Sequence, residues 1–408
     1  MTGVASPDRA VMVREGALER AAALAFLLYV ASLPWSIAAM SVGLAISGVL
    51  TLAAWARGRW DWKPYAAIGW PMLGWLGALL LAAWFAQDRA ASLPRITKGF
   101  LPLIAWMAAY HARTPRAGRR ALAVLLVSAS VAALLGLGLW IARGAAYPER
   151  ARGATGHYMT FAGQLLLWIP IASGIALASR PWRRGAALAA LLGAASLAAT
   201  FTRSAWIGLF VGAGVLLART RPRWLVALAA VAALLVAVAP APYRARLGSA
   251  FDPASASNTE RLHMWDAGVR MFRDHPITGV GLMDLHDVYE RYRPPAAREG
   301  AGHLHSVFVQ IAATMGLMGL VAFGFLYAAL VRACAGGWRE RLAGIPAGLR
   351  LGVTAALAGF LVAGCFEWNF GDEELLHLLY VLVGLAWAAR AWGEAGAEAR
   401  APAAAGTP

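Results

Sequence analysis

Two histidines stand two residues apart in Gly302-His303-Leu304-His305-Ser306, immediately before a long apolar segment. A neutral imidazole can take a proton from a hydroxyl group, because histidine titrates at about 6.5. Ser306 is placed to cap the helix that follows. The pair therefore predicts a general base at the mouth of a helix, with a capping or interfacial role as the alternative. A metal site is not favoured, because no third ligand with suitable spacing accompanies the pair.

Two arginines are the candidate anion ligands. Arg203 lies in the run Thr-Phe-Thr-Arg-Ser-Ala-Trp at 200–206, between two apolar segments that leave almost no loop. A guanidinium fixed at that interface suits bidentate binding of a phosphate, and snorkelling to lipid headgroups is the alternative. Arg261 falls in the first turn of a predicted helix, where the helix dipole disfavours a cation. A solvated charge near Glu260 or Trp265 explains Arg261 equally well.

A second cationic pair, Arg95 and Lys98, follows the third apolar segment. It could hold a diphosphate or contact anionic headgroups, and the sequence does not separate these roles. An acidic group between the last two apolar segments could supply a carboxylate base, although a solvated loop is favoured; it comprises Glu367, Asp372, Glu373 and Glu374. Weaker candidates are Arg150, Arg152 and His157.

The elements that position these residues follow from the composition. The chain has 408 residues, of which 60% are hydrophobic and only 14% charged, with a net charge of +16. This composition excludes an ordinary soluble domain and a disordered chain. Cations scattered between apolar runs are typical of loops that flank membrane spans, so nucleic acid is not an expected partner. We expect an all-α integral membrane protein that contacts membrane lipids.

About twelve segments are apolar enough to be predicted as transmembrane helices. We expect no cleavable signal peptide, because the N-terminal residues are polar, and the first helix then remains as an anchor. The predicted spans are 18–33, 36–56, 65–86, 99–112, 121–142, 159–179, 185–201, 204–218, 224–240, 306–331, 349–366 and 375–392.

The distribution of Lys and Arg orients this bundle. With both termini in the cytoplasm, 22 of the 37 cations fall on the cytoplasmic side, as the positive-inside rule requires. The histidine pair and the candidate cations all fall on the outer side. We therefore predict four parts: nine spans in 1–240, an outer loop with the catalytic elements in 241–305, three spans in 306–392, and a disordered cytoplasmic tail in 393–408.

The long outer loop should carry short amphipathic helices. Its eight Arg are matched by eight carboxylates, which indicates a structured polar element. A helix starting near Asn258 or Thr259 and ending before Pro276 would have an apolar face. That predicted face consists of Leu262, Trp265, Val269 and Phe272. A second short helix is predicted over 283–292.

Taken in order, the motifs resemble those of the O-antigen ligase and polymerase superfamily. They are the Thr-Arg-Ser-Ala-Trp element at a helix junction, the Arg-x-x-x-Trp helix from Arg261, the run Asp-His-Pro-Ile-Thr-Gly-Val-Gly at 274–281, and His-x-His-Ser before a helix that contains Met-Gly-Leu-Met-Gly-Leu at 315–320. These motifs cover about 200–320. Many relatives have Asn after the second histidine, where this chain has Ser306.

The resemblance implies a bacterial inner-membrane glycosyltransferase with its site on the periplasmic face. Its donor would be a glycan on undecaprenyl diphosphate, and a ligase would transfer the glycan to the lipid A-core oligosaccharide, in lipopolysaccharide biosynthesis. Arg203 and Arg261 would bind the donor diphosphate, and His303 or His305 would be the base. We expect an inverting single displacement without metal or other cofactor.

Three alternatives remain. An O-antigen polymerase and a protein O-oligosaccharyltransferase belong to the same superfamily, and the short predicted tail only mildly favours the ligase. A transporter of lipid-linked sugars would place charged groups near the bilayer midplane, often on interrupted helices of paired repeats. No paired halves are visible here, and the charged candidates gather at one predicted face.

Overall fold

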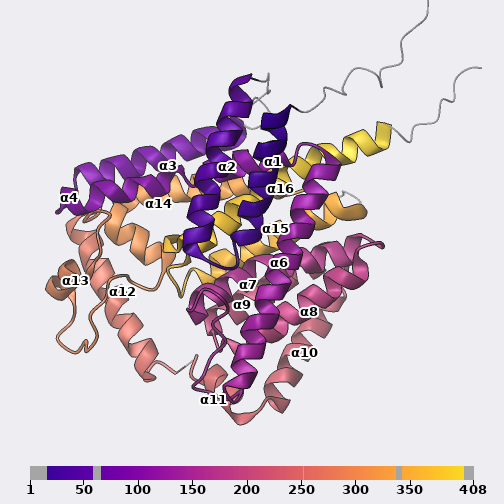
Figure 1. Ribbon diagram of the computed structural model, residues 1–408. Helices are drawn as coiled ribbons and strands as arrows, with labels where there is room; N and C mark the ends of the chain where they lie inside the picture. Colours follow the sequence, from indigo (N-terminus) through magenta and orange to yellow (C-terminus); the bar gives the residue numbers. More distant parts are fainter. Residues whose placement is uncertain (1–15, 58–65, 251, 337–341, 399–408) are drawn as a thin grey trace, which may run out of the picture.

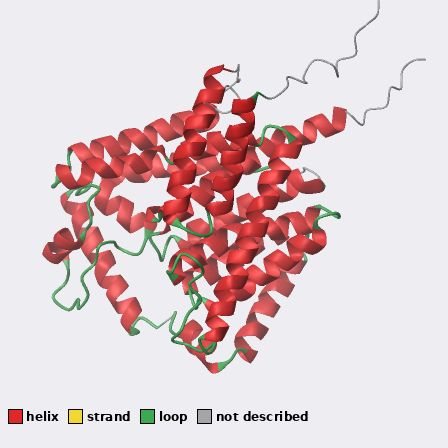
Figure 2. Ribbon diagram, viewed as in Figure 1, coloured by secondary structure: helices red, strands yellow, loops and turns green. Residues whose placement is uncertain are grey.

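The computed structural model describes residues 16–57, 66–250, 252–336 and 342–398, and among these it contains helices but no strand (Figure 2). The first half consists of α1 (Ala17–Ser32), α2 (Ile37–Arg57), α3 (Ala66–Trp84), α4 (Arg89–Ser92), the 3-10 helix η3 (Leu93–Phe100), α5 (Leu103–His111), α6 (Pro115–Ala142), α7 (Tyr158–Ala178) and α8 (Arg183–Ala199). The second half consists of α9 (Arg203–Thr220), α10 (Trp224–Val238), α11 (Ala241–Gly248), α12 (Ala256–Asp274), α13 (His286–Tyr292), α14 (Val307–Cys334), α15 (Gly344–Ala363), the 3-10 helix η4 (Asn369–Gly371) and α16 (Glu373–Glu398).

Each predicted apolar segment contains a helix, but not each helix is long enough to cross a bilayer. Six helices in the described residues meet the length and composition of a membrane span, or seven if α10 and α11 are one bent span. Helix α5 has 9 residues, far fewer than the roughly 20 that a bilayer core needs. The protein is thus an all-α, multi-pass membrane protein, and the twelve-span topology stays a prediction.

Helix α7 is the centre of the bundle, because it packs against α8, α9 and α15 (Figure 1). The contact with α15 depends on glycine. A Cβ added at Gly174 would lie 2.4 Å from the carbonyl oxygen of Gly348, and one added at Gly352 would lie 2.5 Å from the Cα of Ile171. Small residues let two backbones approach closely, which gives membrane helices most of their packing energy.

Within the predicted outer loop, α12 packs against α13 and α14, and residues 280–281 contact the chain just after α3. Helix α12 covers the predicted first helix but starts at Ala256, two residues early. The predicted apolar face of α12 is only partly packed: Leu262 and Val269 are 48% and 43% exposed, whereas Trp265 and Phe272 are half-buried. The buried side chains instead include Met264 and Met271.

Close packing on α14 explains this rotation of α12. Gly268 lies so near α14 that an added Cβ would be 2.4 Å from Val309 and 2.8 Å from Leu304. A small residue therefore selects the packed face, although counting large apolar side chains favours the neighbouring face.

The remaining boundaries shift by a few residues. Helix α13 begins at His286 and not at 283, and it ends at Tyr292 as predicted. Helix α11 occupies the start of the loop, where no helix was expected. Helix α16 continues through Glu398, so the first residues of the predicted disordered tail are helical, and 399–408 lie outside the described residues.

Candidate functional site

The His-x-His segment is a tightly held turn before α14. The Ser306 hydroxyl accepts a hydrogen bond from the backbone N–H of Val309, so Ser306 is the helix cap that was predicted. The Leu304 N–H donates to Gln310 Oε1 (2.8 Å), and the Leu304 carbonyl accepts from Trp265 Nε1 (3.1 Å). These bonds hold His305 at a φ of +45°, a strained value for a residue other than glycine.

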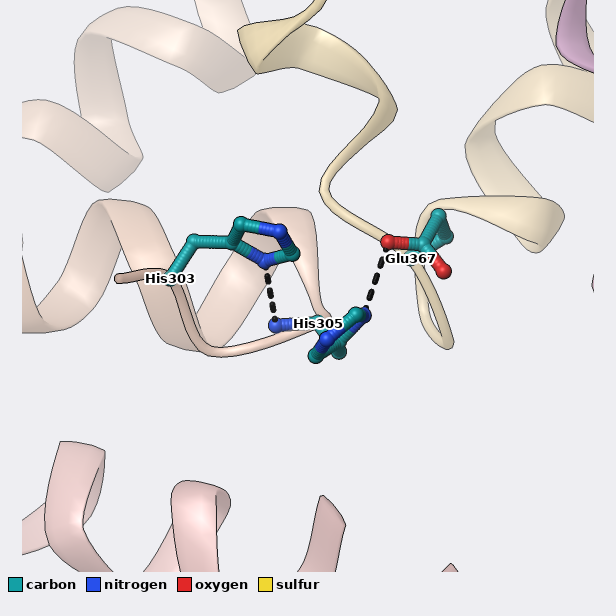
Figure 3. Close-up of side chains that lie close together, drawn as sticks. All are labelled: His303, His305 and Glu367. Carbon is teal, nitrogen blue, oxygen red and sulfur yellow. Dashed lines mark hydrogen bonds and ion pairs between the residues drawn. The ribbon is translucent and has the colours of Figure 1, made fainter. Parts of the chain in front are cut away.

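The two imidazoles meet a glutamate from the other end of the chain (Figure 3). His305 Nδ1 lies 2.9 Å from Glu367 Oε1, and the His305 backbone N–H donates to His303 Nδ1 at 3.4 Å. Because an ionised carboxylate can only accept, His305 Nδ1 carries the hydrogen, and in the neutral form of the ring Nε2 keeps a free lone pair. His303 accepts at Nδ1, so its hydrogen lies on Nε2 in the neutral form.

Glu367 corrects the expectation of a solvated acidic loop. Its residue is only 7% exposed, and its second oxygen, Oε2, forms an ion pair with Arg261 at 3.3 Å. Burial raises the pKa of Glu367, but the hydrogen bond and charge of His305, with the charges of Arg261 and His303, outweigh burial and lower that pKa. Glu367 is therefore ionised and touches both a predicted base and a predicted anion ligand.

His303 is kept neutral by its surroundings. Burial, and then the neighbouring charge of His305, lower the pKa of His303 below its ordinary value. The nearby carboxylates of Glu367 and Asp284 only partly oppose this shift. A neutral imidazole is what the hydrogen bond from the His305 N–H requires, since a protonated ring has no acceptor.

Arg261 does not pair with Glu260, which was one of the two explanations left open. Glu260 instead accepts hydrogen bonds from the backbone N–H groups of Arg298 and Glu299. Arg261 extends from the first turns of α12 to Glu367, 106 residues later in the chain. Helix α12 therefore brings a cation to the histidine pair.

Arg203 does not contact Glu367, but it lies close enough to Arg261 for the two charges to interact. It is buried at the first residue of α9, and its guanidinium donates to three neutral acceptors. These are Ser249 Oγ (3.1 Å), Ser257 Oγ (3.0 Å) and Asn258 Oδ1 (2.7 Å). Arg261 is close enough to repel its charge. Both predicted anion ligands are thus brought together by the start of α12.

Arg95 and Lys98 occupy the other side of the loop between α15 and α16. Both line a cavity of about 100 Å³ whose walls include Trp368 and Tyr380. Lys98 Nζ donates to the Gly371 carbonyl at 2.8 Å and lies 3.5 Å from Glu373. The structure therefore separates this pair from the two arginines, which the sequence left in one group of outer cations.

The α15–α16 loop connects the site residues, and its sequence gave no clear signal. The Gly364 carbonyl accepts from the Val307 N–H at 2.7 Å, which joins the loop to the start of α14. Asp372 accepts from Thr160 of α7 at 3.2 Å. Burial, followed by the charges of Glu374 and Glu367, raises the pKa of Asp372 to about 6. The acidic group at 367–374 was the indication that the sequence offered.

In the folded protein, Glu367 adds a third potential metal ligand to the histidine pair, which the neighbouring sequence does not supply. One ligand atom each from His303, His305 and Glu367 lie within 4.8 Å of one another, close enough for a metal ion. Both carboxylate oxygens, however, already contact His305 and Arg261. The negative charge of Glu367 is therefore matched by the protein itself, which favours a positioning role for the carboxylate.

Comparison with known proteins gives a family match. A family model described as O-antigen ligase matches residues 188–324, from within α8 to within α14. The matched segment contains Arg203, Arg261, His303 and His305, whereas Glu367 lies outside it. A search of curated proteins gave no match. The match over residues 188–324 supports the resemblance to the O-antigen ligase superfamily that the motifs indicated.

Proposed function

We propose that the protein is an O-antigen ligase of the bacterial inner membrane. It transfers a glycan from undecaprenyl diphosphate to the lipid A-core oligosaccharide at the periplasmic face. One observation carries the proposal: Glu367 holds His305 on one oxygen and Arg261 on the other, which places a base beside an anion ligand. Such a pair fits a reaction in which an alcohol attacks and a diphosphate leaves.

His305 is the base in this mechanism. Its Nδ1–H donates to Glu367, so Nε2 is free to take the proton of the acceptor hydroxyl. The hydroxyl oxygen forms a bond to the anomeric carbon of the donor sugar as the bond from that carbon to the diphosphate oxygen breaks. The diphosphate keeps the electron pair, and Arg203 and Arg261 neutralise the growing charge. A single displacement of this kind inverts the anomeric configuration, and no metal takes part.

His303 acts through His305 as a positioning residue. Its Nδ1 is occupied by the His305 N–H, so it is less suited to accept the substrate proton. We propose that Arg95 and Lys98 bind anionic groups of the acceptor, because both line the cavity beside the loop that carries Glu367 and Lys98 contacts the opposite end of that loop.

The test uses the full-length protein in lipid nanodiscs with purified lipid-linked glycan. Transfer to lipid A-core is measured for wild type, His305→Ala, His303→Ala and His303→Gln. We expect His305→Ala to lose about 100-fold or more in rate, because general bases contribute on that order. His303→Gln, which keeps an acceptor atom, should retain more activity than His303→Ala. The exposed His286→Ala in α13 is the matched control and should behave as wild type.

Three results would overturn parts of this proposal. Full activity of His305→Ala would exclude it as the base, and activity lost with a chelator and restored by a divalent cation would exclude a metal-free reaction. Offering lipid A-core, a second lipid-linked glycan or a protein acceptor in parallel separates the ligase from the polymerase and the protein-directed transferase. Transfer only to one of the latter two acceptors would reject the ligase.

A further inference from the structure

A long apolar groove runs between α9 and α10. Its volume is about 550 Å³, and its walls are almost wholly hydrocarbon, including Leu209, Phe210, Ala232 and Leu235. No residue of helix α10 is fully buried. The lining positions on α10 extend from Leu228 to Val238, roughly 15 Å at the rise of an α-helix, or about half of a bilayer core.

The groove ends at a polar element. Helix α11 is bent by 117° from α10, and its Tyr243 and Leu247 line the end of the groove. Arg246 stands between these two residues in the sequence, and its Nε donates to the Phe201 carbonyl at 3.3 Å. Trp206, one turn after the start of α9, lines the same end. In Figure 1, α11 closes one end of the α8, α9 and α10 group.

Cations without carboxylate partners collect at that end. Arg150 lies 4.2 Å from the ring centre of Tyr158 and 5.5 Å from that of Tyr147. Arg150 and Arg246 both lie close enough to Arg203 to repel its charge. Across the described parts of the chain, no carboxylate forms an ion pair with these three arginines. Concentrated positive charge of this kind favours a ligand with more than one negative charge.

We propose that the α9–α10 groove binds the hydrocarbon chain of an isoprenoid diphosphate, with its diphosphate on Arg203, Arg246 and Arg150. The inference rests on the proposed function in one respect, since the donor would be this lipid. An isoprenoid diphosphate combines one long chain with a compact, multiply charged headgroup, and the groove with its arginines combines the matching features. A bilayer phospholipid has two chains and a single phosphate charge, and it fits the site less well.

The groove contributes mainly by positioning the lipid chain, and it adds little hydrophobic free energy of binding. Lipid tails surround a membrane bundle on all sides, so moving a chain into the groove gains little hydrophobic free energy. What the groove contributes is a fixed path for the chain, which ends where the arginines hold the headgroup beside Arg261 and the histidines.

The test labels this path directly. A photoactivatable isoprenoid diphosphate is added to the protein in nanodiscs, and the labelled peptides are identified by mass spectrometry. We expect labelling on α9 and α10 that undecaprenyl diphosphate displaces and phosphatidylglycerol does not. Ala232→Trp fills the groove and should lower this labelling about tenfold or more, because a displaced substrate loses productive contacts steeply. The neighbouring Ala233→Trp, which does not line the groove, is the matched control.

The headgroup contacts are tested on α11. Arg246→Gln should lower labelling and also weaken binding of inorganic diphosphate, whereas Arg244→Gln on the same helix should change neither. Arg246→Lys and Ala213→Trp on α9 serve as second variants, so that a single misfolded variant does not decide the outcome. Three results would overturn the proposal that the groove binds the lipid chain. They are labelling that lies on other helices, equal displacement by phosphatidylglycerol, and unchanged labelling in both Ala232→Trp and Ala213→Trp.

The same preparations separate this inference from the proposed function. Wild-type transfer with labelling outside α9 and α10 would leave the ligase in place and reject the groove. Labelling as expected without transfer to lipid A-core would leave the groove in place and reject the ligase.

Discussion

Two groups of side chains near the start of α12 differ in how their charge is balanced. Arg261 and His305 share the carboxylate of Glu367, each on its own oxygen. Arg203 instead donates to two serines and an asparagine, and other arginines repel it. The first group is held by an internal counter-ion, whereas the second is held by neutral groups that leave its charge available.

This difference indicates that the two groups have different roles, one in positioning the base and one in binding the leaving diphosphate. A charge matched within the protein keeps side chains in one geometry, which is what a base needs. A charge solvated by neutral acceptors remains free to attract an anion, which is what a leaving diphosphate needs. Arg261 belongs to both groups, because it pairs with Glu367 and lies near Arg203.

The largest effect should come from removing the available charge. In Arg203→Gln we expect transfer to fall about 1000-fold, the upper range for loss of one charge-stabilising donor. Arg203→Lys keeps a positive charge but not the planar guanidinium, so its transfer rate should lie between that of Arg203→Gln and that of the wild type. Arg184→Gln, an exposed arginine at the opposite end of α8, is the control. Equal rates for all variants would show that this charge plays no part in the reaction.

Removing the balanced charge should slow transfer while strengthening anion binding. Glu367→Gln leaves Arg261 without its counter-ion, so binding of inorganic diphosphate should tighten severalfold. The maximal rate should fall about 10- to 100-fold, the usual cost of losing a group that orients a histidine. Binding and rate are measured on the same preparation, with the exposed Glu299→Gln as the control. Parallel loss of both quantities would mean that Glu367 only supports the fold.

The pH dependence should show two imidazoles that must both be unprotonated. The pKa of His303 is lowered by burial, so His303 should lose its acceptor role only below its usual titration range. On the acid side, transfer should therefore approach a fall of about 100-fold per pH unit in wild type and about tenfold in His303→Gln. Asp372 has a pKa of about 6 and titrates in the same region, so Asp372→Asn is the necessary control and should keep the steeper fall. Identical slopes in wild type and His303→Gln would contradict the positioning role.

The smallest effect is expected at the cavity beside the loop. Lys98 already pairs with Glu373, and both side chains are about two-fifths exposed, so their interaction is weak. Lys98→Gln and Arg95→Gln should raise the KM for lipid A-core only a few-fold, on the scale of exposed ion pairs. The KM for the donor should not change, and a change in the donor KM alone would reassign the pair to the donor.

Much of the site could be predicted from local sequence because its main residues sit at helix ends. Arg203 and His305 flank apolar segments, and a charge or titratable group at such a junction is visible without the fold. The packed face of α12 could not be predicted, since it depends on the approach of Gly268 to α14. The role of Glu367 could not be predicted either, because its partners lie 62 and 106 residues away.

The sequence by itself determined that the chain is a helical membrane protein, and it predicted which cations and histidines lie at one end of its helices, because hydropathy and charge act residue by residue. The tertiary structure alone decided which of these charges are paired. Pairing depends on distances of 2.7 to 3.3 Å between side chains from α9, α12, the start of α14 and the α15–α16 loop, and it follows from how these helices pack. Packing thus separated a balanced group around Glu367 from an unbalanced group around Arg203.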